Sequence, residues 1–113
     1  MLSLDALAEL GSHCRAATTR KGQILVREGE RGDEVFVVAR GEVEVVRGDG
    51  SAVTPLARLG PGRYFGETAV LHDVPRTATV RATTAGEVLV IDGERFRVVV
   101  GGREAPAPRQ TVG

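Results

Sequence analysis

Glycine residues divide this chain into many short segments, and this punctuation constrains the fold more than any other feature of the sequence. Fifteen of the 113 residues are glycine, about twice the average share. The segments between them are rich in β-branched residues and show no collagen period or low-complexity tract. Short segments of this kind, joined by tight turns, are typical of all-β sandwiches and barrels. The glycines at the predicted turns are Gly22, Gly29, Gly32, Gly41, Gly48, Gly50, Gly60, Gly62, Gly66 and Gly86.

The residues between the glycines predict the individual elements. Glu42 to Val46 alternates polar and apolar residues, as a strand with one exposed face does. Gly48-Asp49-Gly50 predicts a hairpin, and Pro55 beyond it predicts an edge strand or a bulge. One helix is predicted over 3–10, with Ser3 as its N-terminal cap, and another over 66–72. The predicted strands are 15–20, 23–26, 35–39, 42–46, 53–59, 64–65, 77–81 and 87–91.

Composition and charge narrow the class of protein. The 15 basic and 15 acidic residues cancel, there is no basic run, and aromatic residues make up only 4% of the chain. Nucleic-acid binding through this domain is therefore not expected, because such binders need a basic face and aromatic platforms. No segment approaches the ~20 apolar residues of a membrane span, and the first residues lack a secretion signal. We expect one cytoplasmic domain without membrane contact, and the single cysteine, Cys14, fits a reducing compartment.

Catalysis is not expected from this sequence. The only histidines are His13 and His72, too few for the clustered metal ligands of an enzyme on a similar barrel, so no metal cofactor is predicted. No serine or cysteine stands with a plausible general base. A binding or interaction domain is the favoured class.

The segment from Phe65 to Val80 has the composition of a site for a phosphate and a ribose. Gly66 lies at a predicted junction of strand and helix, where the backbone can approach a ligand and the start of the helix favours an anion. Arg76, directly after a proline, offers a planar guanidinium to two phosphate oxygens. Glu67 can accept a hydrogen bond from a ribose hydroxyl. Together these residues indicate a nucleotide ligand.

The same segment resembles the phosphate-binding cassette of cyclic nucleotide-binding domains, the family of cAMP-dependent kinase regulatory subunits and bacterial catabolite-activator sensors. The family pattern is Phe-Gly-Glu, a small residue and an apolar pair, then Pro-Arg, two small or hydroxyl residues and Thr-Val, and residues 65–80 fill nearly every position. Residues 22–30, 32–38 and 41–45 extend the resemblance upstream, to roughly residues 4–100 in all. It implies an antiparallel β-roll, a jelly-roll-like barrel, with a short N-terminal helix, a short cassette helix and a short C-terminal hinge helix.

The resemblance also implies a role for each residue of the cassette. Glu67 would bind the ribose 2′-hydroxyl, Arg76 the exocyclic oxygens of the cyclic phosphate, and the region of Gly66, Ala69 and Ala78 would supply backbone donors. Phe65 is expected to pack mainly in the barrel, and Thr77 leaves the choice between cAMP and cGMP open. The predicted ligand-binding residues are Phe65, Gly66, Glu67, Thr68, Ala69, Arg76, Thr77 and Ala78.

The chain departs from the family pattern at its C-terminal end. Family members follow the barrel with a helix that closes over the base, whereas residues 93–100 here run into Gly101-Gly102 and an Ala-Pro repeat. We therefore predict a cyclic nucleotide-binding domain over 1–100 and a flexible tail or linker over 101–113.

The predicted function is a sensor that binds cAMP or cGMP and regulates an effector domain of a larger parent protein or a partner. Ligand would act by shifting the positions of the hinge and tail. The alternative is an interaction domain that keeps the barrel and has lost the ligand, and the missing lid motivates it.

Overall fold

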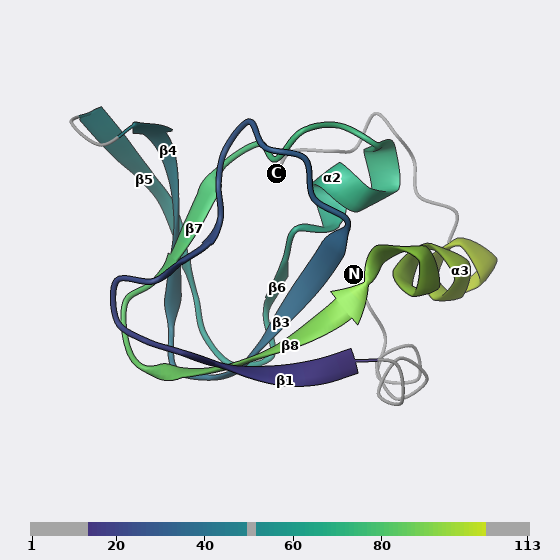
Figure 1. Ribbon diagram of the computed structural model, residues 1–113, viewed down its shortest axis with the longest axis horizontal. Coiled ribbons are helices and arrows are strands. Elements are labelled where there is room, and N and C mark those ends of the chain that lie inside the picture. The colour runs from purple at the N-terminus through teal and green to yellow at the C-terminus, as the bar shows by residue number, and fades with distance from the viewer. Residues whose placement is uncertain (1–13, 50–51, 104–113) are drawn as a thin grey trace.

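The computed structural model describes residues 14–49 and 52–103, which form mainly β-structure (Figure 1). The helix predicted over 3–10 and residues 104–113 lie outside the described residues. The elements in chain order are β1 (Cys14–Thr19), β2 (Ile24–Val26), β3 (Glu34–Arg40), β4 (Val43–Asp49), β5 (Ala52–Leu59), β6 (Tyr64–Phe65), α2 (Glu67–His72), β7 (Thr79–Ala82), β8 (Gly86–Asp92) and α3 (Gly93–Arg103). Every predicted strand is present, with ends that differ by a few residues at most.

Two antiparallel sheets of four strands form the roll. One has the order β1-β8-β3-β6 and the other the order β2-β7-β4-β5. Every strand pair is antiparallel. This arrangement confirms the predicted antiparallel β-roll with a few short helices.

Strand β3 is buried on both of its faces and so joins two hydrophobic cores. Val35 and Val37 belong to a cluster with α2 and α3 on one side of the sheet, while Phe36 and Val38 belong to the interior of the roll. Since successive side chains of a strand point to opposite faces, a nearly continuous apolar run is what a strand in this position needs. The sequence Val35-Phe36-Val37-Val38 supplies that run.

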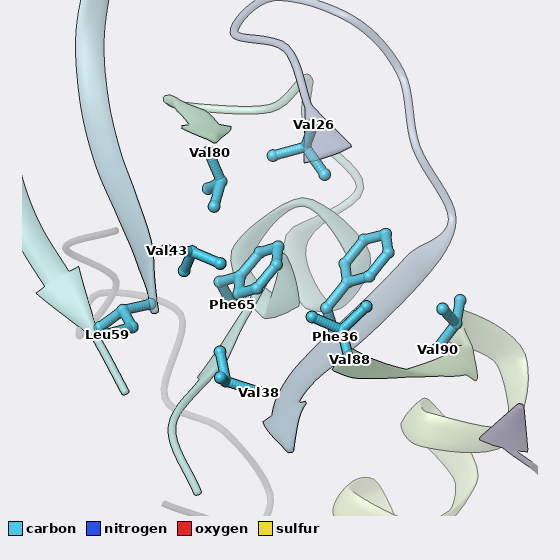
Figure 2. Close-up of a cluster of buried hydrophobic side chains, with 9 residues drawn as sticks. All are labelled: Val26, Phe36, Val38, Val43, Leu59, Phe65, Val80, Val88 and Val90. Carbon is cyan, nitrogen blue, oxygen red and sulfur yellow. The ribbon is translucent and has the colours of Figure 1, made fainter. Parts of the chain in front are cut away.

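The interior core is built around two stacked phenylalanines (Figure 2). The rings of Phe36 and Phe65 lie 4.9 Å apart between centroids and are inclined by only 8°. Phe65 is 5% exposed, which confirms that it packs in the barrel. The aliphatic members of the cluster come from both sheets and are Val26, Val38, Val43, Leu59, Val80, Val88 and Val90.

The strand β5 lies at the edge of its sheet and contains a bulge. Its pairing with β4 passes from Val45 opposite Ala57 to Val46 opposite Pro55, so Leu56 is left without an opposing residue. Proline has no N–H to give to a ladder and is found at sheet edges and bulges. Both features predicted from Pro55 are therefore present.

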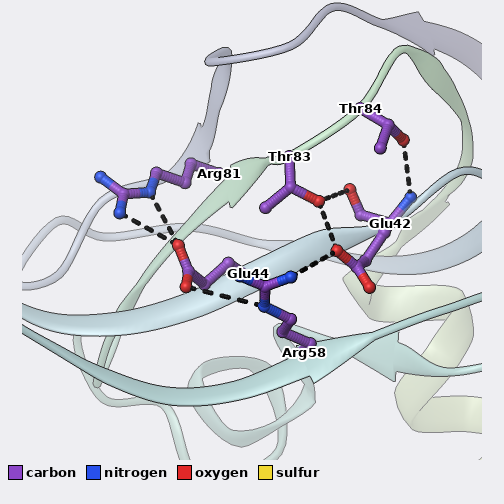
Figure 3. Close-up of polar contacts among 6 residues, drawn as sticks. All are labelled: Glu42, Glu44, Arg58, Arg81, Thr83 and Thr84. Atoms are coloured by element: carbon purple, nitrogen blue, oxygen red, sulfur yellow. Dashed lines mark hydrogen bonds and ion pairs between the residues drawn. The ribbon is translucent and has the colours of Figure 1, made fainter.

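The outer face of the β4, β5 and β7 sheet carries a network of charged side chains (Figure 3). Glu44 of β4 lies opposite Arg58 of β5 and Arg81 of β7 in the strand register. Arg81 donates from Nε and Nη2 to one Glu44 carboxylate oxygen, at 3.1 and 3.0 Å. Arg58 lies 4.0 Å from the other oxygen and 3.4 Å from Glu42. Such cross-strand pairs favour one register of the three strands.

Helix α3 extends farther than its glycines predict. It continues through Gly101 and Gly102 to Arg103, whereas these glycines predict that it ends at Val100. Each glycine costs a helix about 1 kcal/mol relative to alanine. Packing of Phe96 and Val100, which are 1% and 8% exposed, stabilises the helix against that cost. The division between domain and tail remains a prediction. None of the described helices is long and apolar enough to cross a membrane.

Replacing Phe96 with alanine should strongly destabilise the domain. Phe96 joins α3 to Val35, Ile91 and Val70 in the outer core. Loss of a buried phenylalanine side chain costs about 3–5 kcal/mol of unfolding free energy, which urea denaturation would measure.

Val98→Ala on the same helix is the matched control. Val98 is 60% exposed, so its truncation should change the unfolding free energy by no more than about 0.5 kcal/mol. Equal losses in the two variants would contradict this orientation of α3.

Candidate functional site

The predicted site residues line one pocket of about 410 Å³. This volume lies within the range of small-molecule sites, about 300–1,000 Å³. One wall comes from β6, α2 and the segment before β7, and the other from β4 and β5, which stand apart from α2 in Figure 1. All eight predicted residues contribute to the lining: Phe65, Gly66, Glu67, Thr68, Ala69, Arg76, Thr77 and Ala78.

The side chain of Arg76 is held in place by backbone carbonyl groups. Its Nη1 donates to the carbonyl oxygen of Gly66 and its Nη2 to that of Glu34, each at 3.0 Å. The guanidinium also lies over the ring of Phe36, 6.0 Å from the centroid, within the range of a cation–π interaction. Since a guanidinium has five N–H donors, these contacts orient it and leave donors for another acceptor.

The loop between β2 and β3 fixes the backbone and the side chain of Arg76. The Arg76 N–H donates to the carbonyl of Glu30 at 2.9 Å, and the Gly29 N–H donates to the carbonyl of Arg76 at 2.8 Å. A Cβ added to Gly32 would overlap the Arg76 guanidinium, so only glycine leaves room there. This loop therefore packs beside the site.

The buried charge of Arg76 pairs with no acidic side chain that the structure describes. Its exposed fraction is 7%, and none of the carboxylates in the described part of the chain forms an ion pair with it. Burial lowers the pKa of its guanidinium below the ordinary value, while the charges of Glu34 and Asp33 oppose that shift. Charged side chains are rarely buried without a counter-charge. The pocket therefore favours an anion beside Arg76.

Gly66 connects β6 to α2 in a conformation that suits glycine. Its φ is +92°, and a Cβ at this position would lie 2.8 Å from Arg76 Nη1 and 3.0 Å from the Glu34 carbonyl oxygen. The predicted strand-to-helix junction is thus confirmed. The same residue turns the chain and gives Arg76 a carbonyl acceptor.

Glu67 begins α2 and lines the pocket. Burial raises the pKa of its carboxyl, and a hydrogen bond with its own backbone N–H acts in the opposite direction. Within the described ranges, no lysine or arginine forms an ion pair with it. A carboxylate in such a position can accept a hydrogen bond from a ligand hydroxyl.

The other predicted residues divide between packing and the surface of the pocket. Thr68 and Ala69 are buried in α2, and Val70 beside them packs in the outer core. Thr77 and Ala78 precede β7, which begins at Thr79 and not at Thr77 as predicted. These two residues pair with no strand and line the pocket between Arg76 and the sheet.

Sequence reasoning missed the wall formed by β4 and β5. This wall adds Val45, Arg47, Leu56, Ala57 and Leu59 to the pocket. Two signals could have indicated it: the alternation in β4, which places residues 43, 45 and 47 on one face, and the bulge at Pro55. The remaining missed residues are Val26, Arg63, Tyr64 and Val80.

Comparison with known proteins places the chain in a family. Residues 17–101 match the family described as Cyclic nucleotide-binding domain. The chain belongs to the cyclic nucleotide-binding domain family. Members of this family are ligand-binding regulatory domains. Residues 14–49 and 52–103 of this chain contain no cluster of three or more His, Cys, Asp or Glu residues that could hold a metal ion.

The proteins similar to this chain include a kinase regulatory subunit, a kinase and a catabolite activator protein. The cAMP-dependent protein kinase regulatory subunit of Yarrowia lipolytica is 37% identical over 103 residues, which cover 84% of this chain and 27% of that protein. The cGMP-dependent protein kinase of Toxoplasma gondii is 39% identical over 82 residues, covering 72% of this chain and 8% of that protein. The crystal structure of the Thermus thermophilus Catabolite Activator Protein matches with a TM-score of 0.77 and 27% identity, covering 88% of this chain and 47% of that one. This cyclic nucleotide-binding domain thus spans only part of the length of each.

Replacing Glu67 with glutamine should stabilise the domain in the absence of ligand. A carboxyl whose pKa is raised by folding stabilises the fold at low pH, and this contribution is lost as the pH rises through the raised value. Glutamine keeps the shape and removes the charge. We expect a higher Tm at neutral pH and a smaller decline of Tm as the pH rises from about 4 to 7, measured by thermal unfolding.

Glu94→Gln is the matched control, because Glu94 also lies in the first turn of a helix but is exposed. It should not raise the Tm at neutral pH. A rise of the same size in both variants would show that burial of Glu67 is not the cause.

Proposed function

We propose that this domain binds a cyclic nucleotide, cAMP or cGMP, in the pocket lined by Arg76 and Glu67, and that binding regulates an effector. The observation that carries the proposal is the buried guanidinium of Arg76, which has oriented donors and no ionic partner in the described chain. A cyclic phosphate diester supplies one negative charge and two exocyclic oxygens for those donors.

The other predicted residues would bind the rest of such a ligand. Glu67 stands free of ion pairs to described cations and would accept from the ribose 2′-hydroxyl. Gly66, Ala69 and Ala78 would offer backbone donors to the phosphate, with Thr68 and Thr77 beside them. Phe65 would support the site from the core, where it stacks on Phe36 beneath Arg76.

Helix α3 would respond to the ligand through its contacts with the β2–β3 loop and α2. Arg97 Nη1 lies 3.2 Å from Asp33 Oδ1 and donates to the carbonyl of Val70 in α2 at 3.1 Å. The Gly93 N–H donates to the carbonyl of Asp33 at 2.8 Å. Asp33 directly follows Gly32, which packs on Arg76. A change around the phosphate would therefore reach α3 through the β2–β3 loop and α2, and an effector attached to α3 or docked on it would be regulated.

Arg76→Ala should abolish most of the nucleotide affinity. Loss of a charge-assisted, two-point contact with the phosphate is expected to weaken binding by about 30- to 1,000-fold, equivalent to about 2–4 kcal/mol. Calorimetric titration of the ligand-stripped chain with cAMP and then cGMP measures it, with thermal unfolding to verify that the variant folds. If neither nucleotide binds the unaltered chain, the proposal fails and the ligand-free interaction domain becomes the better interpretation.

A glycine pair tests the position of Arg76 without removing it. Gly32→Ala should displace the guanidinium and weaken binding, because its Cβ would overlap that group. Gly60→Ala is the control, since a Cβ there meets no atom within 4 Å and the backbone is unstrained. Equal affinities in these two variants would contradict the assigned contact between Gly32 and Arg76.

Saturating nucleotide should alter amide hydrogen exchange in α3, over residues 93–100. The expected change follows from the contacts of Asp33 and Val70 with Arg97. Arg97→Ala should reduce this response while nucleotide still binds. If saturating ligand leaves amide hydrogen exchange in α3 unchanged, regulation through this helix is contradicted. The proposal that the pocket binds a nucleotide would not be affected by that result.

A further inference from the structure

The wall of the pocket opposite α2 carries an arginine that neither the phosphate nor the ribose requires. Arg47 lines the pocket from β4. Its Nε donates to the carbonyl oxygen of Thr77 at 3.3 Å, so the end of the side chain is tied to the segment that follows Arg76. This bond uses Nε and leaves the terminal nitrogens, Nη1 and Nη2, for another acceptor.

The neighbours of Arg47 on this wall are apolar. Val45 lines the pocket two residues earlier on β4, on the face that Arg47 shares. Across from it, the bulge in β5 leaves Leu56 48% exposed, and Leu56 and Ala57 also line the pocket. An apolar wall suits the flat face of a purine base. A base lying on Val45 and Leu56 would meet Arg47 with its polar edge.

We propose that Arg47 reads the base of the bound cyclic nucleotide and favours guanine over adenine. The inference rests on the proposed function and concerns the same pocket. A guanidinium has donors only, and guanine presents two acceptors, O6 and N7, that match its fork. Adenine places its N6 amino donor beside N7, so the same fork would meet a donor.

The test compares cGMP, cAMP and cIMP, the cyclic nucleotide whose base is hypoxanthine. These three bases differ in the polar groups on their edges. Thr77 also lines the pocket, and its hydroxyl could contact the 2-amino group of guanine. Hypoxanthine keeps O6 and N7 and lacks that amino group. A preference for cIMP over cAMP therefore reports the edge assigned to Arg47 and cannot arise from the amino group.

Calorimetric titration of the ligand-stripped full chain with cGMP, cIMP and cAMP should show tighter binding of the first two. A bidentate pair discriminates by about 1–3 kcal/mol, which is about a 5- to 150-fold difference in affinity. Arg47→Ala should remove this preference and leave cAMP affinity within about twofold. Arg47→Lys should also lose most of the preference, because an ammonium group keeps the charge without the fork.

Arg58→Ala is the matched control. It removes one arginine from the neighbouring strand on the opposite face of the same sheet, where Arg58 pairs with Glu42 and Glu44. The Arg58→Ala variant should show the same preference among the three nucleotides as the unaltered chain.

The remaining outcomes overturn the inference in different ways. Equal weakening of all three nucleotides by Arg47→Ala would assign Arg47 to the phosphate. Arg47 does not read O6 and N7 if the chain prefers cAMP or binds all three nucleotides equally. The same conclusion follows if the chain binds cGMP tightly but cIMP weakly. Binding of none of the three would overturn the proposed function itself, a result distinct from binding without preference.

Discussion

The burial of one guanidinium organises the region around the pocket. Arg76 takes its acceptors from Gly66 and Glu34, rests on Phe36 and leaves space only for glycine at position 32. These contacts come from the β2–β3 loop and the adjoining β3, and from the junction of β6 and α2, which lies far from them in the sequence. Hydrogen bonds to carbonyls orient a positive charge without neutralising it. An anion in the pocket would supply the missing charge, so that folding and the proposed binding would depend on the same side chain.

Strand β3 connects this charge to the rest of the molecule. Phe36 faces the interior and supports Arg76, whereas Val35 and Val37 face the outer core with Phe96 of α3. The two cores share the backbone of β3. Because well-packed interiors transmit strain, a displacement of this strand in one core also shifts side chains in the other. The polar contacts of Arg97 with Asp33 and Val70 add a second connection between α3 and the pocket. A helix held by both kinds of contact is a suitable output for a binding event.

Local signals in the sequence predicted the fold and one half of the candidate site, and long-range pairing accounts for what they missed. Glycines at turns, β-branched segments and Pro55 predicted the strands, and the segment from Phe65 to Ala78 predicted one wall because its residues are close along the chain. The other wall depends on which strands pair and in which register. The alternation in β4 and Pro55 indicate a strand face and a bulge but not that pairing, so Arg47 and Leu56 were not predicted. The extent of α3 was misjudged for a related reason. Helix-breaking glycines are a local property, whereas burial of Phe96 and Val100 is a tertiary one.

The bulge at Pro55 has a consequence for the behaviour of the domain in a crowded solution. Among the described strands, β5 is one of the two edges of its sheet, and an open edge can recruit a strand of another molecule and start aggregation. Proline withholds one donor from such a partner, and the bulge interrupts the regular spacing that a new ladder would need. Thus the irregularity that turns Leu56 toward the pocket also makes this edge a poor template for further strands, and a regular β5 would expose the protein to self-association.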